Sequence, residues 1–338
     1  MVHVRSASLL QDGSIAILSA GTYEIRLFDA DGDLLQTVGR QGQGPGEFME
    51  PLGARFSRDG GGVVVDAVNQ RMTTFDTQWK VEREERIPYP IGPRATLDSG
   101  GPPLEGGVIA IPSLGMSVRE VARRAEGVYE DSLVIEVVYE GRRQVTLRRL
   151  RGRSFQSRVD GGGIVKVIPF GEEALYVWAG DRIVLGTSHS LDFAAFDPSG
   201  KTIGRYRLQG QLREPTSTDW ALYQARLRQE FAGTRTVAGV LIDRPTQAER
   251  FLSEAPRGDW LPLFDALHID RAARLWAREY GALGEVAWWQ VATVPEGVVA
   301  RVPLPSGAVL LDAGDDYVLV LERDELGVEM VRMYGLAN

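Results

Sequence analysis

The sequence contains no cysteine and only three histidines among its 338 residues. Without thiols the chain has no disulfide framework, no thiolate metal site and no thiol nucleophile, and three scattered histidines argue against a histidine-rich metal centre. No apolar run reaches the ~18 residues that a membrane-spanning helix needs. Basic residues are in the minority, with 38 Lys and Arg against 46 Asp and Glu, and the net charge of -8 argues against a nucleic-acid partner.

What the sequence does contain is an internal repeat. Asp12-Gly13 returns as Asp59-Gly60, and Phe28-Asp29 returns as Phe75-Asp76, at a spacing of 47 residues in both cases. Asp-Gly between apolar runs favours a tight β-hairpin, because glycine supplies the positive φ that such turns require. A repeat of this length is typical of one four-stranded blade of a β-propeller.

We therefore predict an all-β fold, a six-bladed β-propeller that forms a single domain over residues 1–338. Phe196-Asp197 marks a fourth blade, and one enlarged blade fills the interval before it, with outer strands expected at 132–139 and 144–150. The last blade has one strand too few, whereas residues 2–5 have no partner. Pairing the N- and C-terminal strands within one blade would close the ring and remove an exposed edge.

Residues 214–262 break the strand pattern and predict a helical insertion between blades four and five. Ser217 or Thr218 is the candidate N-cap of a first helix, and a second helix is expected to begin at Pro245. The apolar residues on one face of the first helix are Trp220, Tyr223, Leu227 and Phe231. The insertion is a candidate lid, because long loops on a rigid scaffold often carry function. The alternative is that its apolar face only docks the helices onto the blades.

Two motifs carry a family resemblance. The link Gly44-Pro45-Gly46-Glu47-Phe48 and the turn Asp66-x-x-Asn69-x-Arg71 together resemble the NHL repeat and the wider group of six-bladed bacterial β-propellers. The resemblance implies the fold and leaves function open, since such proteins include binding modules, scaffolds and enzymes. The residues also suit a structural role, in which the glycines form tight turns and Asp66 with Arg71 fastens a loop through a charge-assisted hydrogen bond.

The topology of a propeller gathers the candidate ligand-binding residues at the mouth of its channel. Loops that join second to third strands, and links from one blade to the next, lie on one face of such a fold. The candidates are Tyr23, Asn69, Arg71, Asp192, Trp220, Tyr223, Trp260, Tyr280 and Trp288. The tryptophans suit apolar or carbohydrate ligands at a concave site, although the same rings also suit packing between blades.

His189 is the candidate catalytic residue, with Ser188 and Asp192 nearby in the sequence. A triad within one loop is disfavoured, because triads assemble from distant segments and neighbours in an extended strand point to opposite faces. The scarcity of histidine departs from the amidating-lyase branch of propeller enzymes. No cofactor is predicted and no metal ligand is assigned, although the many carboxylates are compatible with calcium, as in gluconolactonase-type propellers.

The leading functional hypothesis is a binding or interaction module of NHL-like type. Its ligand, a small molecule or a protein or peptide, would lie at the channel mouth under the helical insertion. The alternative is a small-molecule hydrolase or lyase that uses the same pocket with a bound divalent cation, and a third hypothesis is a structural scaffold. No nucleic acid and no membrane span are expected. An extracytoplasmic address, with a leader removed before the opening strand, is favoured.

Overall fold

The computed structural model describes most of the chain as antiparallel β-sheet. The described residues are 3–87, 109–114, 127–139, 142–158, 164–179, 182–231, 234–237, 240–254, 257–281 and 286–336. They form five four-stranded sheets, one three-stranded sheet and one two-stranded hairpin, and in each sheet the strands are neighbours in chain order.

The four-stranded sheets follow one another along the chain. The first holds β1 (Val4–Leu9), β2 (Ile15–Ser19), β3 (Glu24–Phe28) and β4 (Leu34–Val38). The second holds β5 (Pro51–Phe56), β6 (Gly62–Asp66), β7 (Arg71–Phe75) and β8 (Val81–Arg86). The third holds β9 (Ile109–Leu114), β10 (Gly127–Tyr139), β11 (Arg142–Arg158) and β12 (Ile164–Val167). The fourth holds β13 (Ala174–Ala179), β14 (Arg182–Thr187), β15 (Asp192–Phe196) and β16 (Thr202–Arg207). The fifth holds β19 (Phe264–Ile269), β20 (Leu275–Glu279), β21 (Val286–Thr293) and β22 (Gly297–Pro305).

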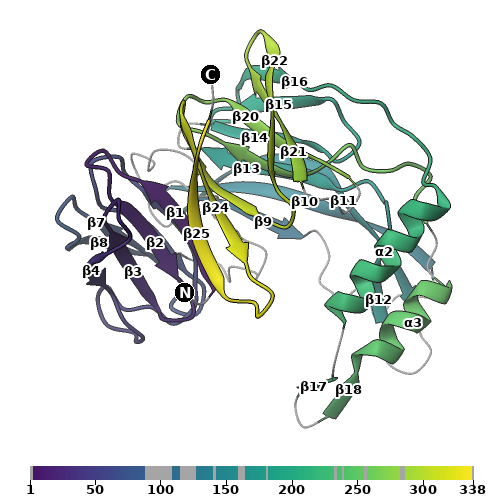
Figure 1. Ribbon diagram of the computed structural model, residues 1–338, viewed down its shortest axis with the longest axis horizontal. Coiled ribbons are helices and arrows are strands. Elements are labelled where there is room, and N and C mark those ends of the chain that lie inside the picture. The colour runs from purple at the N-terminus through teal and green to yellow at the C-terminus, as the bar shows by residue number, and fades with distance from the viewer. Residues whose placement is uncertain are drawn as a thin grey trace.

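At several places in the molecule, the first strands of neighbouring sheets pack against one another. β1 lies against β5, and β13 lies against β19. β23 (Val309–Ala313), which opens the three-stranded sheet with β24 (Tyr317–Arg323) and β25 (Glu329–Gly335), lies against both β19 and β1. Figure 1 shows β24 of the same sheet beside β1, with which it is in contact. Sheets that stand face to face about their inner strands define a β-propeller, and this part of the prediction is confirmed.

The predicted number of blades and the predicted closing sheet are not confirmed. The structure has five four-stranded sheets, and the last set of strands, β23–β25, has three. Val4 and Arg5, which we expected beside β25, instead belong to β1, where Val4 pairs with Ser19 of β2. Hydrogen bonding to β2 extends the first sheet, and among the described strands none completes the last one.

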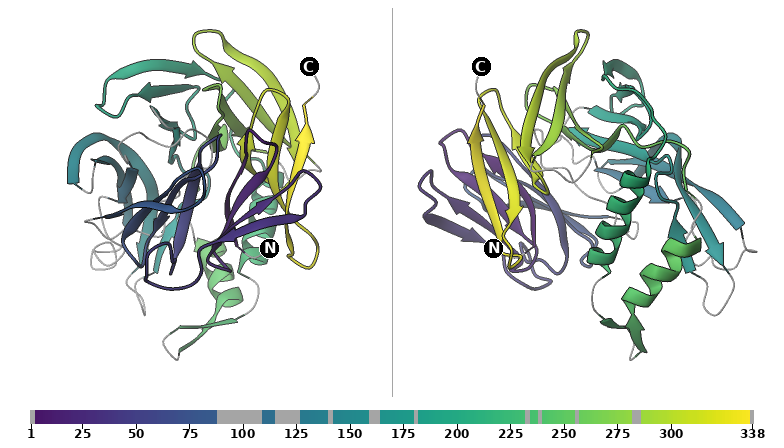
Figure 2. Two further views of the ribbon diagram at one scale, coloured as in Figure 1. Left: turned by 90° about the vertical axis from the view of Figure 1, so that its left-hand side faces the viewer. Right: turned by 45° about the vertical axis from the view of Figure 1, so that its right-hand side comes forward.

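Side chains join the two ends of the described chain in place of a shared sheet. The N–H of Val4 donates to Oε2 of Glu329 at 2.7 Å. Val4 and Ala7 of β1 are buried in one core cluster with Leu311 and Leu319 of the last sheet. Both views in Figure 2 show β25 beside the first sheet, so the ring closes by packing between faces.

The repeated aspartates explain the 47-residue period locally. Asp29, Asp76 and Asp197 each follow a third strand, and one carboxylate oxygen of each accepts the backbone N–H groups two and four residues further on. This closes the hairpin to the fourth strand, where Gly32 and Gly200 both have a φ of 88°. The short aspartate side chain and the positive-φ glycine together favour this turn.

The insertion contains more than the two predicted helices. α2 spans Ser217–Glu230 and α3 spans Arg244–Glu254, with the hairpin β17 (Thr234–Val237) and β18 (Val240–Asp243) between them. The N-cap of α2 is Thr216, one residue before the earlier of our two candidates, and it forms a capping box with Asp219. α3 begins at Arg244, one residue before the expected Pro245. Neither described helix is long and apolar enough to cross a membrane.

Candidate functional site

A cavity of about 450 Å³ lies where the chain leaves β16, where the insertion ends, and where sheet β19–β22 faces both. We call it the inter-sheet cavity, and we call residues 257–263, which precede β19, the return segment. Leu261 N–H donates to the Arg213 carbonyl at 2.9 Å, and Leu263 N–H donates to the Ser188 carbonyl at 2.7 Å. Backbone hydrogen bonds from distant parts of the sequence therefore hold the cavity walls.

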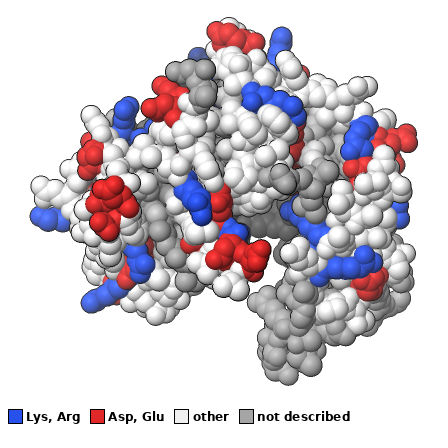
Figure 3. Space-filling model, in the orientation of Figure 1, with Lys and Arg blue, Asp and Glu red and all other residues white. Residues whose placement is uncertain are grey.

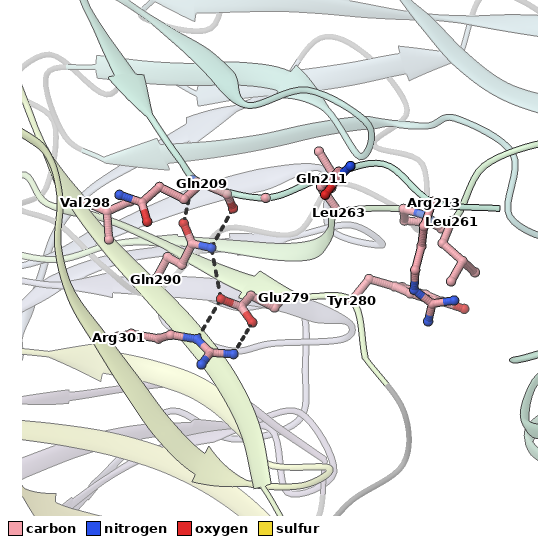
Figure 4. A pocket seen from close by; sticks show the side chains of 12 residues that line it. Gln209, Gln211, Arg213, Leu261, Leu263, Glu279, Tyr280, Gln290, Val298 and Arg301 are labelled. Carbon is pink, nitrogen blue, oxygen red and sulfur yellow. Dashed lines mark hydrogen bonds and ion pairs between the residues drawn. The ribbon is translucent and has the colours of Figure 1, made fainter. Parts of the chain in front are cut away.

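Gln209, Gln290, Glu279 and Arg301 form one hydrogen-bonded chain along a side of the cavity (Figure 4). Oε1 of Gln290 accepts the N–H of Gln209 at 2.8 Å, and its Nε2 donates to the Gln209 carbonyl at 2.7 Å. The same Nε2 donates to Oε1 of Glu279 at 2.9 Å. Arg301 binds both oxygens of that carboxylate, at 2.9 and 2.7 Å. Because the side chains of Gln290, Glu279 and Arg301 are each held by a partner, this wall is preorganised.

The charges of this wall are balanced within it. Burial acts to raise the pKa of Glu279, but hydrogen bonds from Arg301 and Gln290 outweigh burial and hold that pKa below its ordinary value. Glu279 therefore stays ionised at neutral pH, paired with a guanidinium. The ring of Trp288, a predicted ligand residue, packs against Arg301, with its centroid 4.3 Å from the guanidinium carbon.

Tyr280 lines the inter-sheet cavity away from that wall (Figure 4). Its ring packs edge-on against Phe170, with centroids 6.4 Å apart. Burial raises the pKa of Tyr280 to about 12, so its hydroxyl stays protonated at neutral pH. That hydroxyl makes no hydrogen bond to another described residue, which leaves it available to a ligand.

The predicted aromatic residues of α2 pack beneath the helix. Phe170 lies edge-on to Trp220 and Tyr223, with centroid distances of 6.0 and 5.3 Å, and Trp220 stacks on Tyr223 at 5.4 Å. Phe251 and Leu252 of α3 complete this apolar cluster. These contacts favour the docking interpretation of the helix face, while a lid role stays a prediction.

Trp260, in the return segment, is 43% exposed. It lines a second, wider cleft of about 710 Å³ at the N-terminus of α2, which we call the helix cleft. One edge of Trp220 also reaches this cleft. Two of the predicted ligand residues therefore share a concave surface, separated from the inter-sheet cavity by the return segment.

Asn69 and Arg71 contact the glycine-rich link and line neither cavity. Nδ2 of Asn69 donates to the Gly42 carbonyl at 3.1 Å, and Arg71 donates to the carbonyls of Gly44 and Glu47 at 2.8 and 2.6 Å. We expected Asp66 to pair with Arg71, but Arg71 forms its ion pair with Glu84, at 3.3 Å. Asp66 instead accepts backbone N–H groups, among them that of Asn69 at 2.8 Å. These contacts support the loop-fastening interpretation.

Tyr23 and Asp192 lie apart from both cavities. Tyr23, with a φ of 61°, sits in the turn between β2 and β3 and packs against the core of the first two sheets. Asp192, the first residue of β15, is exposed, with Oδ1 3.8 Å from Nε of Arg207. The structure therefore brings only part of the predicted set together.

His189 is half-buried in the loop between β14 and β15 and lines neither cavity. Burial lowers the pKa of His189, while the nearby Glu172 acts in the opposite direction. The hydroxyl of Ser188 accepts the Glu173 N–H at 3.1 Å, and no hydrogen bond joins Ser188 to His189 among the described contacts. A catalytic role for His189 stays a prediction.

The sequence analysis missed Gln209, Glu279, Gln290 and Arg301. A signal for Gln290 exists, since it is a polar residue directly after Trp288-Trp289 in a strand and is only 6% exposed. Nothing in the sequence connects it to Gln209, which is 81 residues away.

Potential metal ligands are dispersed in the described part of the chain, and charges of both signs are mixed on the face shown in Figure 3. Figure 3 shows acidic and basic side chains interspersed on the displayed face, without a large patch of one sign. Within the described ranges, no group of three or more His, Asp or Glu side chains is placed to hold a metal ion. The calcium hypothesis stays a prediction.

The structure is a β-propeller with a helical insertion, and two cavities lie beside that insertion. No family model matches the chain, and neither does any curated protein. Similar solved structures include a candidate exported protein of Bacteroides fragilis, 12% identical with a TM-score of 0.48, covering 95% of this chain and 80% of that one. A duf4221 family member of Bacteroides vulgatus is 13% identical, with a TM-score of 0.44 and coverages of 98% and 95%. Virginiamycin B lyase of Staphylococcus aureus is 11% identical, with a TM-score of 0.36 and coverages of 99% and 85%. Likeness at this level leaves ligand and activity open.

Proposed function

We propose that the protein is a binding module whose ligand occupies the inter-sheet cavity. The observation that carries the proposal is the hydrogen-bonded wall of Gln290, Glu279 and Arg301 in the same cavity as the free hydroxyl of Tyr280. Fixed polar groups around a cavity of about 450 Å³ fit the range of about 300–1,000 Å³ that is usual for small-molecule sites.

The cavity favours a polar ligand of small net charge. Arg301 and Glu279 neutralise each other, and Arg213 pairs with Asp219 at 2.6 Å, so neither guanidinium is left to compensate an anionic ligand alone. Tyr280 offers a donor, and the exposed Gln211 offers both a donor and an acceptor. A small polar molecule or the polar end of a peptide matches this set.

The test is a thermal-shift screen with amino acids, nucleosides, sugars and dipeptides, followed by calorimetry of any ligand found. Tyr280→Phe removes only the hydroxyl and keeps the ring on Phe170, so we expect Kd to rise about tenfold, as for one lost hydrogen bond of about 1.4 kcal/mol. Tyr334→Phe is the matched control, because its hydroxyl bonds Glu322 on the outer face of the last sheet. Equal affinity of both variants and wild type would refute the proposed cavity.

The alternative hypothesis is a hydrolase or lyase that uses the same cavity. We test it by incubating the protein with esters, lactones and phosphoesters and measuring their turnover. Turnover of any of them, and its loss in Tyr280→Phe, would support that alternative, whereas His189→Ala tests separately whether His189, which lines neither cavity, takes part. The repeat and the two motifs further support a relationship to six-bladed NHL-like propellers, and an extracytoplasmic address is proposed with it.

A further inference from the structure

We propose that the helix cleft is a binding site for a neutral carbohydrate, separate from the inter-sheet cavity. The cleft of about 710 Å³ lies between residues 214–217, at the N-terminus of α2, and residues 257–260 of the return segment. The proposal does not depend on the proposed function, because no residue lines both cavities.

The walls of the helix cleft are held in place. Gly258 N–H donates to the Pro169 carbonyl at 2.7 Å, and a Cβ at position 258 would lie 2.3 Å from the Phe170 carbonyl oxygen, so the backbones touch there. On the opposite wall, Thr216 and Asp219 form the capping box of α2, and Arg213 binds both oxygens of Asp219 at 2.6 and 2.8 Å. A cleft between two fixed walls keeps its shape before a ligand arrives.

Arg257 lines the helix cleft, and its planar guanidinium is held against the ring of Trp220. Its guanidinium carbon lies 3.8 Å from the centroid of Trp220, and the ring of Tyr223 also stacks on Trp220, at an interplanar angle of 11°. Stacking of this kind fixes the plane of a guanidinium and leaves its N–H groups at the edge free to donate.

Two carboxylates, those of Glu214 and Asp259, line the same cleft and are exposed. Neither side chain forms an ion pair or a hydrogen bond with Arg257 or with any other described residue. The cleft therefore presents acceptors and donors that do not satisfy each other. Elsewhere in the described chain, arginines such as Arg278 and Arg301 are paired with acids at 2.6 and 2.7 Å.

Trp260 adds an apolar ring surface to the charged side chains of Glu214, Arg257 and Asp259. It is 43% exposed, which is unusual for a side chain of this size that prefers burial. Indole rings at concave sites suit ligands that have one apolar face and a polar rim.

The balance of charges selects the class of ligand. Two carboxylates against one guanidinium disfavour an anion, and the unpaired charges of both signs disfavour a purely apolar molecule. A neutral sugar satisfies all of these groups, since its hydroxyls donate to Glu214 and Asp259 and accept from Arg257. Its C–H face covers Trp260.

The experiment is calorimetric titration of the full chain with three neutral tetrasaccharides, of glucose, mannose and N-acetylglucosamine, and with tetragalacturonate as an acidic probe. We expect saturable binding of at least one neutral tetrasaccharide and weaker binding of tetragalacturonate. Trp260→Ala and Asp259→Ala, both at exposed positions, are each expected to raise Kd about tenfold. Circular dichroism melts check that the variants remain folded.

Tyr334→Ala is the matched control for Trp260→Ala, since Tyr334 is also an exposed aromatic residue, 36% exposed, on β25. It should leave the tetrasaccharide affinity unchanged. Absence of binding by every neutral tetrasaccharide, tighter binding of tetragalacturonate, or equal affinity of Trp260→Ala and wild type would each overturn the proposal. A polar ligand that still binds in the inter-sheet cavity would then show that only the helix-cleft proposal had failed.

Discussion

His189 is a single residue whose surroundings make stability depend on pH. Its Nε2 atom is buried, and the backbone of Phe170 and Trp260 lies close to the ring. Burial holds the pKa of His189 below its ordinary value of 6.5, against the opposing charge of Glu172. The folded state therefore takes up this proton less readily than the unfolded state, so the free energy of unfolding should fall as pH drops below about 6.5.

We predict that His189→Gln flattens this pH dependence. Between pH 7.5 and 5.5, above the main range of carboxylate titration, wild type should lose more stability than the variant, because only wild type takes up a proton at this partly desolvated ring. Urea unfolding at the two pH values measures the loss, and equal losses in the two proteins would contradict the assigned burial effect.

At the scale of elements, the return segment connects the insertion to the propeller. It touches the loop around Phe170 through Gly258, the β14–β15 loop through Leu263, and the exit of β16 through Leu261. The helices themselves contribute an apolar cluster in which Phe170 meets Trp220 and Tyr223. The insertion is therefore docked by packing, and both cavities depend on where the return segment runs.

Gly258→Ala should displace the return segment, because the added Cβ would overlap the Phe170 carbonyl oxygen. We expect a loss of about 1–3 kcal/mol in the free energy of unfolding and faster hydrogen exchange in α2 and α3. Gly281→Ala is the matched control, since the nearest atom to its Cβ would be 3.9 Å away, and it should change stability by less than about 1 kcal/mol. Unchanged exchange in α2 for Gly258→Ala would contradict the docking role.

At the scale of the whole molecule, the first and last sheets meet through side chains. Glu329 is the central polar contact, since its carboxylate accepts the N–H of Val4 and also pairs with Arg323 at 2.8 Å. Arg271 lies between the same sheets and forms an ion pair with the buried Asp312 at 3.1 Å. Asp312 also accepts the N–H of Leu9 at 3.0 Å, so a second polar contact reaches β1.

Glu329→Ala should weaken this closure by about 1–3 kcal/mol, because it leaves the buried N–H of Val4 without its acceptor. Glu322→Ala on the same sheet is the control. Its contacts with Tyr334 and Arg332 stay within that sheet, so we expect a cost below about 1 kcal/mol. Urea unfolding measures the stability of the Glu329→Ala and Glu322→Ala variants, and hydrogen exchange of β1 shows whether its contact with the last sheet is weakened. Equal losses of stability in the two variants would argue against closure through Glu329.

Local chemistry in the sequence determined the hairpins and their period. The Asp-Gly and Phe-Asp pairs act within four residues, so Asp29, Asp76 and Asp197 could be placed in turns before any tertiary contact was known. Helical spacing likewise placed the start of α2 to within one or two residues, because its capping and apolar face are local signals.

Only the tertiary structure decided how the ends meet and where the cavities lie. A strand such as Val4–Leu9 can pair on either edge, and its pairing with β2 in place of the last sheet depends on the whole ring. The wall of the inter-sheet cavity joins Gln209 to Gln290, and the floor of the helix cleft joins Trp220 to Arg257. Such contacts arise from the packing of separate sheets and helices, and turn chemistry and periodicity carry no information about them.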